Sequence, residues 1–314
     1  MKILVGGASG DIGIGCARIL KNISFVSSVI GFDIRPEPCN EYYFDAFTCS
    51  PRADAPEFLD WLLDYIVKLD IQIYIPTSEA ELLRLSGENI PVDFAKRIMI
   101  LDSSIVQSCL DKSACMAVLA RSGLATPVTG LADDEEPNTF PVILKPRNGR
   151  GSQKIRYVKD RASFLSLRER GDIWQKYIPQ TEGEYTCGVF RSSSGDSRSI
   201  VFQRELRNGR TVSGEVFERP EIHDYVIRVA EIFHLHGSFN VQLRILDGTP
   251  MAFEINPRLS STLVFRDLLG FRDLRWWLCD LLRRPIETYK PPTSGTRFFR
   301  GDAEFFLTAK EQHS

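Results

Sequence analysis

The sequence predicts an α/β domain at the N-terminus followed by smaller α+β units. Roughly the first hundred residues alternate short apolar strands with helical patterns, which indicates a parallel sheet with right-handed crossovers. A second block, roughly residues 112–178, repeats strand and helix patterns on a smaller scale. A third block is rich in strands and includes a hairpin at residues 240–256. We therefore expect two or three compact units in this chain.

The composition is typical of a globular protein and argues against a general nucleic-acid-binding or membrane-binding function. The 314 residues are 43% hydrophobic and 25% charged, with a net charge of −2. Such a balance gives no general attraction to nucleic acid or to anionic membranes. No run of about 18 apolar residues suggests a membrane span, and the N-terminus does not have the pattern of a signal peptide. The seven scattered cysteines favour a reducing, cytoplasmic compartment.

The first domain is predicted element by element from its apolar periodicity. A strand pattern is stopped by glycines, and helical spacing at i, i+3 and i+4 follows. The predicted elements are a strand at residues 3–5, a glycine turn and helix at 6–21, a strand at 29–32, a helix at 58–69 and a strand at 71–75.

The glycine turn of this domain offers a first functional hypothesis. Gly7, Gly10 and Gly13 follow a strand, and Asp33 ends the next strand, as in Rossmann-like dinucleotide sites. A nicotinamide-dependent oxidoreductase is therefore one alternative. However, such short-chain or epimerase-type enzymes need a Tyr-x-x-x-Lys pair, and the sequence has none. The other interpretation is that the glycines only shape a turn in a Rossmann-like sheet.

The second block contains a lysine at a strand end before a glycine-rich loop. A helix is predicted at residues 111–122, and strands and a helix follow at 141–145, 155–158, 160–170 and 173–177. Lys145 can reach a phosphate oxygen, because the following proline keeps the backbone extended. The loop, with Gly149, Gly151 and Ser152, can offer backbone N–H groups to phosphates. The alternative is a plain hairpin with a basic tip.

The third block ends in a hairpin with a polar face and an apolar face. Gln242, Glu254 and Asn256 share the polar face, and Arg258 follows. Hard oxygen donors suit Mg²⁺ and arginine suits phosphate, so the sequence predicts a Mg-ATP site here. A two-residue turn would mix the faces, whereas a three-residue loop at 247–249 sets Gln242 opposite Glu254. We expect an odd-numbered loop or a β-bulge, and a solvated polar face is the alternative.

Other elements of this block are less informative about function. Strands are predicted near residues 184–191, 199–204 and 212–217, and helices at 221–235 and about 272–283. Further residues are candidates for phosphate or substrate contacts by position only: Arg204, Arg210, Thr211, Glu215 and Arg266.

Four motifs together resemble the ATP-grasp superfamily. They are "DK" at residues 111–112, "LKPRNGRGS" at 144–152, "WQKYIPQTEGEYT" at 174–186 and "FNVQ…FEINPR" at 239–258, in the order and spacing of that family. The nearest resemblance is to ligases like the large subunit of carbamoyl-phosphate synthase and its carboxylate–amine ligase relatives. "PTSEAEL" at 76–82 resembles the domain that precedes the ATP-grasp fold.

The resemblance implies a domain organisation and a set of cofactors. A Rossmann-like pre-ATP-grasp domain would occupy residues 1–110, and a two-lobed ATP-grasp fold would follow. Its small lid subdomain would span residues 111–180 and its C-terminal subdomain, with the metal site, residues 181–314. The implied cofactors are ATP and Mg²⁺, with Mn²⁺ as an alternative.

The resemblance also implies roles for individual residues. Lys145 and Arg258 would be catalytic, and Arg258 would also hold the γ-phosphate. The implied metal ligands are Gln242, Glu254 and Asn256, and Glu254 would bridge two Mg²⁺ ions. The implied ATP contacts are Lys112, Lys145, Gly149, Gly151, Ser152, Gln175, Lys176, Tyr177, Ile178, Glu184 and Arg258.

The implied activity is an ATP-dependent ligation. A carboxylate would be activated as an acylphosphate and joined to an amine, with release of ADP and phosphate. The partners would be ATP, a small carboxylate and an amine, without nucleic acid or membrane, and a homodimer is compatible with this function. Two alternatives stay open: the oxidoreductase above and a non-catalytic ATP-binding module. The substrate pocket draws on C-terminal residues that match no motif, so the prediction covers substrate classes only.

Overall fold

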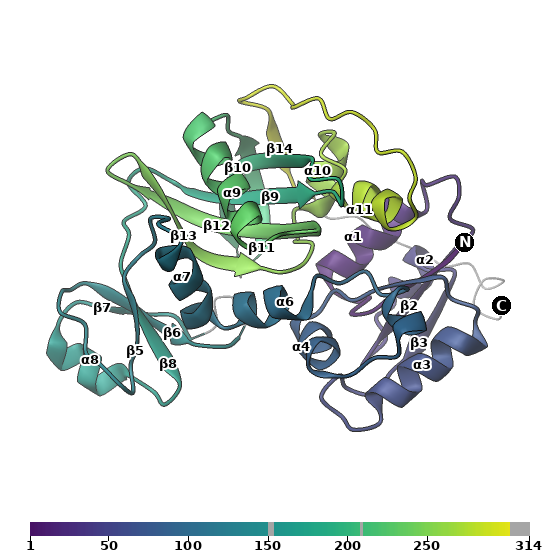
Figure 1. Cartoon of the computed structure of the whole chain (residues 1–314), viewed down its shortest axis with the longest axis horizontal. Coiled ribbons are helices and arrows are strands. Elements are labelled where there is room, and N and C mark those ends of the chain that lie inside the picture. Colours follow the sequence, from purple (N-terminus) through teal and green to yellow (C-terminus); the bar gives the residue numbers. More distant parts are fainter. Residues whose placement is uncertain (150–153, 208–209, 302–314) are drawn as a thin grey trace. The chain divides into compact units, whose positions relative to one another are not determined.

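The computed structural model describes residues 1–149, 154–207 and 210–301, without the side chains of residues 206, 207 and 210 (Figure 1). The chain forms two compact units. Among the described residues, the first contains Met1–Ile100, Leu259–Thr288 and residues 299–301, and the second contains Leu101–Arg258 and Tyr289–Phe298. The predicted domain boundaries at residues 110 and 180 stay predictions. Residues 259–288 belong to the same unit as the N-terminal sheet.

The first unit contains a four-stranded parallel sheet. The strand order is β3-β2-β1-β4, and all three ladders are parallel. The strands are β1 (Lys2–Val5), β2 (Ser28–Asp33), β3 (Ala46–Cys49) and β4 (Ile73–Ile75). The Rossmann-like arrangement predicted for this part is confirmed, although β3 was not predicted.

The same unit contains helices that pack on this sheet or on one another. They are α1 (Asp11–Leu20), α2 (Asn40–Tyr43), α3 (Phe58–Lys68), α4 (Glu79–Gly87) and α5 (Val92–Ala95), with α10 (Leu263–Leu268) and α11 (Asp273–Leu281) from the later segment. Phe58, Leu62 and Ile66 of α3 form a core with residues of β1, β2 and β4. On α1, a Cβ at Gly15 would meet Leu263 at 3.0 Å, so glycine lets α10 approach closely.

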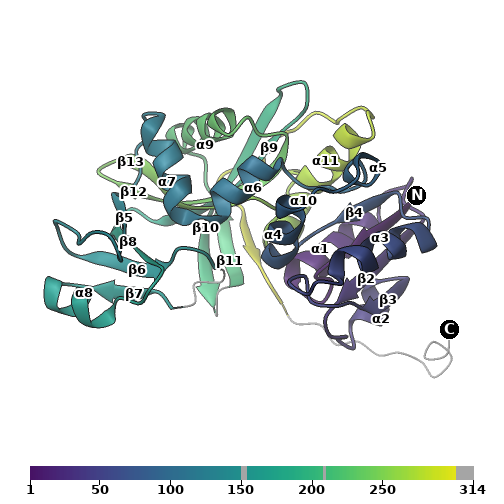
Figure 2. The same ribbon diagram turned by 60° about the horizontal axis from the view of Figure 1, so that its bottom comes forward.

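The second unit contains two sheets. The smaller one has the order β5-β8-β6-β7, with antiparallel ladders, and α8 (Arg161–Leu167) packs beside β7 (Figure 2). Its strands are β5 (Thr129–Leu131), β6 (Val142–Pro146), β7 (Arg156–Val158) and β8 (Asp172–Lys176). Val142, Leu144, Val158 and Trp174 bury their side chains against Phe164 of α8.

The larger sheet has six strands in the order β13-β12-β9-β10-β11-β14. They are β9 (Glu184–Arg191), β10 (Ser197–Arg207), β11 (Arg210–Val216), β12 (Gly237–Leu246), β13 (Thr249–Asn256) and β14 (Arg297–Phe299). The unit's remaining helices are α6 (Ser103–Leu110), α7 (Lys112–Arg121) and α9 (Pro220–Ile232). This mixture confirms the predicted α/β and α+β fold class. None of the helices that the structure describes has the length and apolarity that a membrane crossing requires.

A β-bulge sets the register of the β12–β13 hairpin. The predicted three-residue loop is wrong, because Leu246 pairs with Thr249 across a two-residue turn at Asp247 and Gly248, which both have positive φ. Such φ values are typical of the turns that match strand twist. The register then shifts after Gln242, so the predicted alternative, a bulge, is confirmed and Gln242 faces Glu254.

Candidate active site

One face of the large sheet carries the predicted metal ligands in neighbouring rows. In one row, Thr186 of β9, Gln242 of β12 and Glu254 of β13 are direct neighbours across the ladders. In the next row, Asn240 and Asn256 are partners. Residues two apart in a strand point to the same side, so these rows share one face. Thr186 Oγ1 donates to Asn240 Oδ1 at 3.0 Å, which makes the floor of this face a buried hydrogen-bonded layer.

Lys145, near the end of β6, connects the small sheet to the large sheet. Its Nζ donates to Gln175 Oε1 and to the carbonyl oxygen of Phe253, both at 3.0 Å. Phe253 is the extra residue of the β13 bulge, and bulges commonly redirect groups near functional sites. Burial lowers the pKa of Lys145 to about 8, while Glu254 raises this pKa and Lys112 lowers it further. The lysine therefore lies within electrostatic reach of both a predicted metal ligand and the second predicted phosphate ligand.

The identity of residue 175 matters for this lysine. Residue 175 is Gln, whose side chain is neutral. Here the amide accepts from Lys145 and donates from Nε2 to Thr129 Oγ1 at 3.1 Å. Both hydrogen-bond acceptors of Lys145 are thus neutral, and the ammonium keeps its charge for an anionic ligand. Lys176, the next residue, has an exposed side chain.

Lys112, the first residue of α7, contacts the glycine-rich loop. Its Nζ donates to the carbonyl oxygen of Gly149 at 2.6 Å, and its backbone N–H donates to Arg147. Asp111 caps the helix by accepting two backbone N–H groups of the first turn. The same carboxylate accepts two bonds from Arg147, at 2.8 and 2.6 Å. Asp111 therefore fixes both the predicted phosphate lysine and the entry to the loop, which is why Arg147 belongs to the site although it was not predicted.

The loop itself is described only at its edges. Gly149 has φ 134°, a backbone conformation that favours glycine. The predicted ligands Gly151 and Ser152 lie outside the described residues, so their roles stay predictions.

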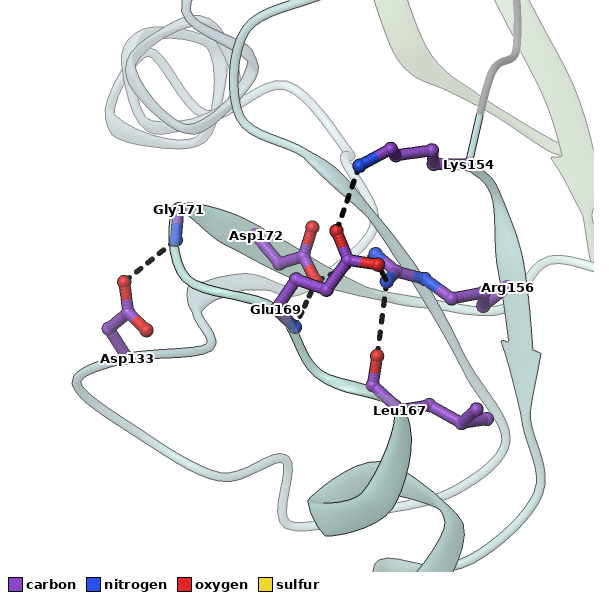
Figure 3. Close-up of polar contacts among 7 residues, drawn as sticks. All are labelled: Asp133, Lys154, Arg156, Leu167, Glu169, Gly171 and Asp172. Atoms are coloured by element: carbon purple, nitrogen blue, oxygen red, sulfur yellow. Dashed lines mark hydrogen bonds and ion pairs between the residues drawn. The ribbon is translucent and has the colours of Figure 1, made fainter.

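An ion-pair network holds the chain that leaves the loop (Figure 3). Arg156 contacts Asp172 at 2.7 Å and Glu169 at 2.9 Å, and Lys154 contacts Glu169 at 3.1 Å. The backbone N–H of Glu169 also donates to Asp172. Asp172 is 3% exposed, so its charge is compensated by a partner inside the unit. The network ties β7 to the start of β8, next to the strand that carries Lys145.

Arg244 occupies the region predicted for the nucleoside, and sequence reasoning missed it. Its Nη1 donates to the carbonyl oxygen of Ile178 at 2.6 Å, and its Nε and Nη2 donate to Glu184 Oε2. The guanidinium lies 5.8 Å from the ring of Tyr177 and 5.6 Å from that of Phe253. The predicted adenine-edge and ribose residues are therefore assembled around one arginine. Its place two residues after Gln242 on the polar face was the only signal in the sequence.

Glu184 is held in its charged form by this arrangement. Burial alone would raise its pKa, but hydrogen bonds from Arg244 and Gln180, with the charge of Arg204, keep the pKa below the usual value. The carboxylate is thus available as an acceptor for hydroxyl groups at neutral pH.

The predicted metal ligands fit a hard cation only in part. Glu254 and Asn256 lie on one face, and Asn256 Nδ2 approaches Glu254 Oε1 at 3.3 Å. A carboxylate and an amide oxygen are suitable ligands for Mg²⁺. By contrast, Gln242 Oε1 accepts a 2.7 Å hydrogen bond from Arg204 Nη2. Among the described residues no group of three or more His, Cys, Asp or Glu forms a metal cluster, and the predicted set contains only one such residue.

Arg258 lies just beyond these ligands. Its backbone N–H donates to the carbonyl oxygen of Asn256 at 2.8 Å, which closes a tight turn at the end of β13. The side chain is half-buried, so the turn places a partly accessible cation two residues after Asn256. Thr211 is fully buried and Glu215 half-buried, while the side chain of Arg210 is outside the described part of the chain.

The N-terminal glycine turn is occupied by the protein's own groups. Asp33 accepts backbone N–H groups from Ser9 at 3.0 Å and from the residue that follows it. Asn40 donates to Ser9 Oγ at 2.9 Å. A Cβ at Gly13 would lie 2.5 Å from the carbonyl oxygen of Gly7, so this glycine serves close packing. These contacts favour the structural interpretation of the turn over a dinucleotide site.

Arg266 forms an ion pair inside the first unit. Its position in the sequence had suggested a substrate contact instead. Its side chain is fully buried in the first unit and lies 2.8 Å from Asp273, which is also buried. Ser260 accepts a further bond from its Nη1. The expectation for Arg266 is therefore wrong.

Comparison with known proteins identifies the part of the chain that holds this site. Residues 109–262 match the family model described as an ATP-grasp domain. The chain contains an ATP-grasp domain. This domain includes both lysines, the nucleoside region and the β12–β13 hairpin, so every residue to which the family resemblance gave a role lies within the match.

Proteins similar to this chain are distant in sequence. It is 26% identical over 186 residues to an uncharacterized protein, y4rH, of Sinorhizobium fredii (51% of this chain, 38% of the relative). It is 25% identical over 173 residues to D-alanine–D-alanine ligase of Bacillus anthracis (47% of this chain, 56% of the relative). The match therefore covers 38% of the length of the first relative and 56% of the length of the second.

A solved structure extends the fold comparison to nearly the whole chain. The biotin carboxylase domain of the Hydrogenobacter thermophilus 2-oxoglutarate carboxylase, in complex with MgADP, ADP and bicarbonate, has a TM-score of 0.72. The alignment covers 92% of this chain and 71% of that domain at 15% identity. At this identity the similarity shows the fold alone, and it confirms the predicted two-lobed ATP-grasp fold.

Proposed function

We propose that this chain is an ATP-dependent carboxylate–amine ligase that uses Mg-ATP and releases ADP and phosphate. The observation that carries the proposal is Lys145: a buried ammonium with two neutral hydrogen-bond acceptors, in electrostatic contact with both Glu254 and Lys112. A buried cation without a bonded counter-ion is costly unless an anion binds to it. A triphosphate with its Mg²⁺ supplies that anion next to a carboxylate that suits the metal.

Different residues of the site would contact different parts of the nucleotide. Lys112 and Lys145 would hold phosphate oxygens, and Glu184 would accept the ribose hydroxyls. Backbone groups at residues 175–178 would contact the edge of the base. Glu254 and Asn256 would hold Mg²⁺, which neutralises charge on the transferring phosphoryl group.

The reaction would proceed in two steps with balanced atoms. A substrate carboxylate oxygen attacks the γ-phosphorus, the bond to the β-bridging oxygen breaks, and ADP leaves. An amine then attacks the acylphosphate carbonyl, loses a proton, and expels phosphate. Arg258, by its place beyond Asn256, would hold the carboxylate and the transferred group together. The protein's contribution is positioning and exclusion of water, because acylphosphates hydrolyse.

The substrate classes are a small carboxylic acid and a small amine. A ligase of two amino acids, D-alanine–D-alanine ligase, is among the similar proteins, which makes amino acids the first class to test. All seven cysteines are free, and we therefore assign the enzyme to a reducing compartment such as the cytoplasm.

An ADP-release screen over pairs of amino acids tests the proposal. ADP and phosphate should form only when both a carboxylate and an amine are present, and Glu254→Gln should abolish the signal. Nucleotide binding without turnover for any pair would favour a non-catalytic ATP-binding module. Binding of NAD(P)H with hydride transfer would instead support the oxidoreductase alternative.

A further inference from the structure

Arg204 of β10 places a fixed positive charge beside the predicted metal site. Its Nη2 donates to Gln242 Oε1 at 2.7 Å and lies 3.5 Å from Glu184 Oε1. The side chain is only 8% exposed. We propose that Arg204 is a built-in cation that takes the place of one of the two magnesium ions implied by the family resemblance. A single divalent ion would then bind with the nucleotide, at Glu254 and Asn256.

This inference deepens the proposed function and rests on it, because it assumes that Mg-ATP binds on this face. It departs from the sequence-based expectation at one residue. Gln242 was expected to coordinate metal, but the structure engages its only ligand oxygen with a guanidinium. Arginine stays protonated in proteins, so the donor at this oxygen is a cation.

The distances make a metal ion and Arg204 competitors for Gln242. Mg²⁺ binds oxygen at about 2.1 Å. An ion on Gln242 Oε1 would therefore lie within about 5 Å of Arg204 Nη2. Two cations so close in a buried site repel strongly, since the local dielectric is low. Either the arginine leaves or the metal does not use this oxygen.

The surroundings of Arg204 hold it in place. Burial lowers its pKa, whereas the charges of Glu184 and Glu254 raise it, so two carboxylates stabilise the guanidinium. Glu184 in turn is fixed by Arg244 through Oε2, which leaves Oε1 for Arg204. Arg204 is thus the outer member of a row of alternating charges across β10, β9 and β12. Moving it would leave Gln242 and Glu184 without this partner.

The guanidinium also keeps a donor for a ligand. Its Nε is buried and has no hydrogen-bond partner within the described residues. Buried donors in proteins are nearly always satisfied, so an unpaired one in a binding face indicates a ligand atom. A phosphate oxygen next to Glu254 would satisfy it, and arginine matches phosphate geometry well. Arg204 would then neutralise phosphate charge in the way that a second metal ion would.

Counting bound Mn²⁺ ions by electron paramagnetic resonance tests whether Arg204 takes the place of a second metal ion. The full chain is titrated with MnCl₂ in the presence of saturating β,γ-imido-ATP, and free Mn²⁺ is read from its six-line signal. The native protein should bind one Mn²⁺ per chain. Arg204→Lys keeps the charge and should also bind one. Arg204→Gln removes the charge, frees the oxygen of Gln242, and should bind a second ion.

A second variant makes the test independent of any folding defect at residue 204. Gln242→Ala should retain one Mn²⁺ per chain with an affinity within about threefold of native, because this side chain is not a ligand in the proposal. Loss of an ion in Gln242→Ala, or two ions in the native protein, would overturn the proposal and leave the proposed function intact. No nucleotide-dependent Mn²⁺ at all would overturn both.

Discussion

Lys145 should make nucleotide affinity depend on pH in a range where an ordinary lysine does not titrate. Burial lowers its pKa from 10.5 to about 8. At pH 9 only about one molecule in ten of the free protein would then carry the ammonium. If the triphosphate needs that charge, the apparent Kd rises about tenfold between pH 7 and pH 9, which is about 1.4 kcal/mol. An exposed lysine with a pKa of 10.5 would change Kd by only a few per cent.

The assay is a titration with β,γ-imido-ATP by calorimetry at several pH values, in buffers with different ionisation enthalpies. Because bound triphosphate favours the charged lysine, binding above pH 8 should take up a proton from the buffer. The matched control is Lys145→Arg, which stays charged throughout and should show neither proton uptake nor the rise in Kd above pH 8. A flat Kd in the native protein, or an equal slope in the arginine variant, would refute the reasoning.

The same pKa has a consequence for stability with a definite sign. The folded-state pKa is below that of the unfolded chain, so the unfolded chain binds more protons between about pH 8 and 10.5. The cost of the buried charge is therefore fully present below pH 8 and is relieved as pH rises through this window, by up to about 3 kcal/mol. Urea unfolding of the native protein and of Lys145→Met between about pH 8 and 10.5 measures this change in the free energy of unfolding.

Three further changes have distinct expected results. Glu254→Gln should lower turnover at least about a hundredfold while leaving the thermal midpoint nearly unchanged; native turnover would contradict the metal assignment. Asp111→Ala removes a helix cap and the contact with Arg147, and chemical denaturation should show a loss of about 1–3 kcal/mol, whereas Asp111→Asn, which keeps a capping oxygen, should lose less. Gly13→Ala should destabilise the first unit by about 1–3 kcal/mol but leave the Kd for imido-ATP unchanged, and a large change in Kd would revive the dinucleotide hypothesis.

Much of the fold could be predicted because apolar periodicity is local. Strands β1, β2 and β4 of the first sheet and helix α3 follow directly from it. Strand β3 was not predicted; it is four residues long, and its residues at the sheet edge are exposed or half-exposed. Helix α4 was missed although Ser78 and Glu81 form a capping box that the sequence displays.

The site was harder to predict because its decisive contacts are not local. The polar face of the hairpin could be recognised from alternation, and the conflict between the turn and the faces indicated a bulge. The partners of Arg244 come from Ile178 and Glu184, more than fifty residues earlier in the chain. The bond from Arg204 to Gln242 likewise depends on the order of three strands. Spacing along a sequence does not contain that order.

A crystal structure with β,γ-imido-ATP and Mn²⁺ tests the central claim most directly. We expect an anomalous peak beside Glu254 and Asn256 and a triphosphate in contact with Lys112 and Lys145. Nucleotide bound instead at the turn from Gly7 to Gly13, with no peak beside Glu254, would contradict it.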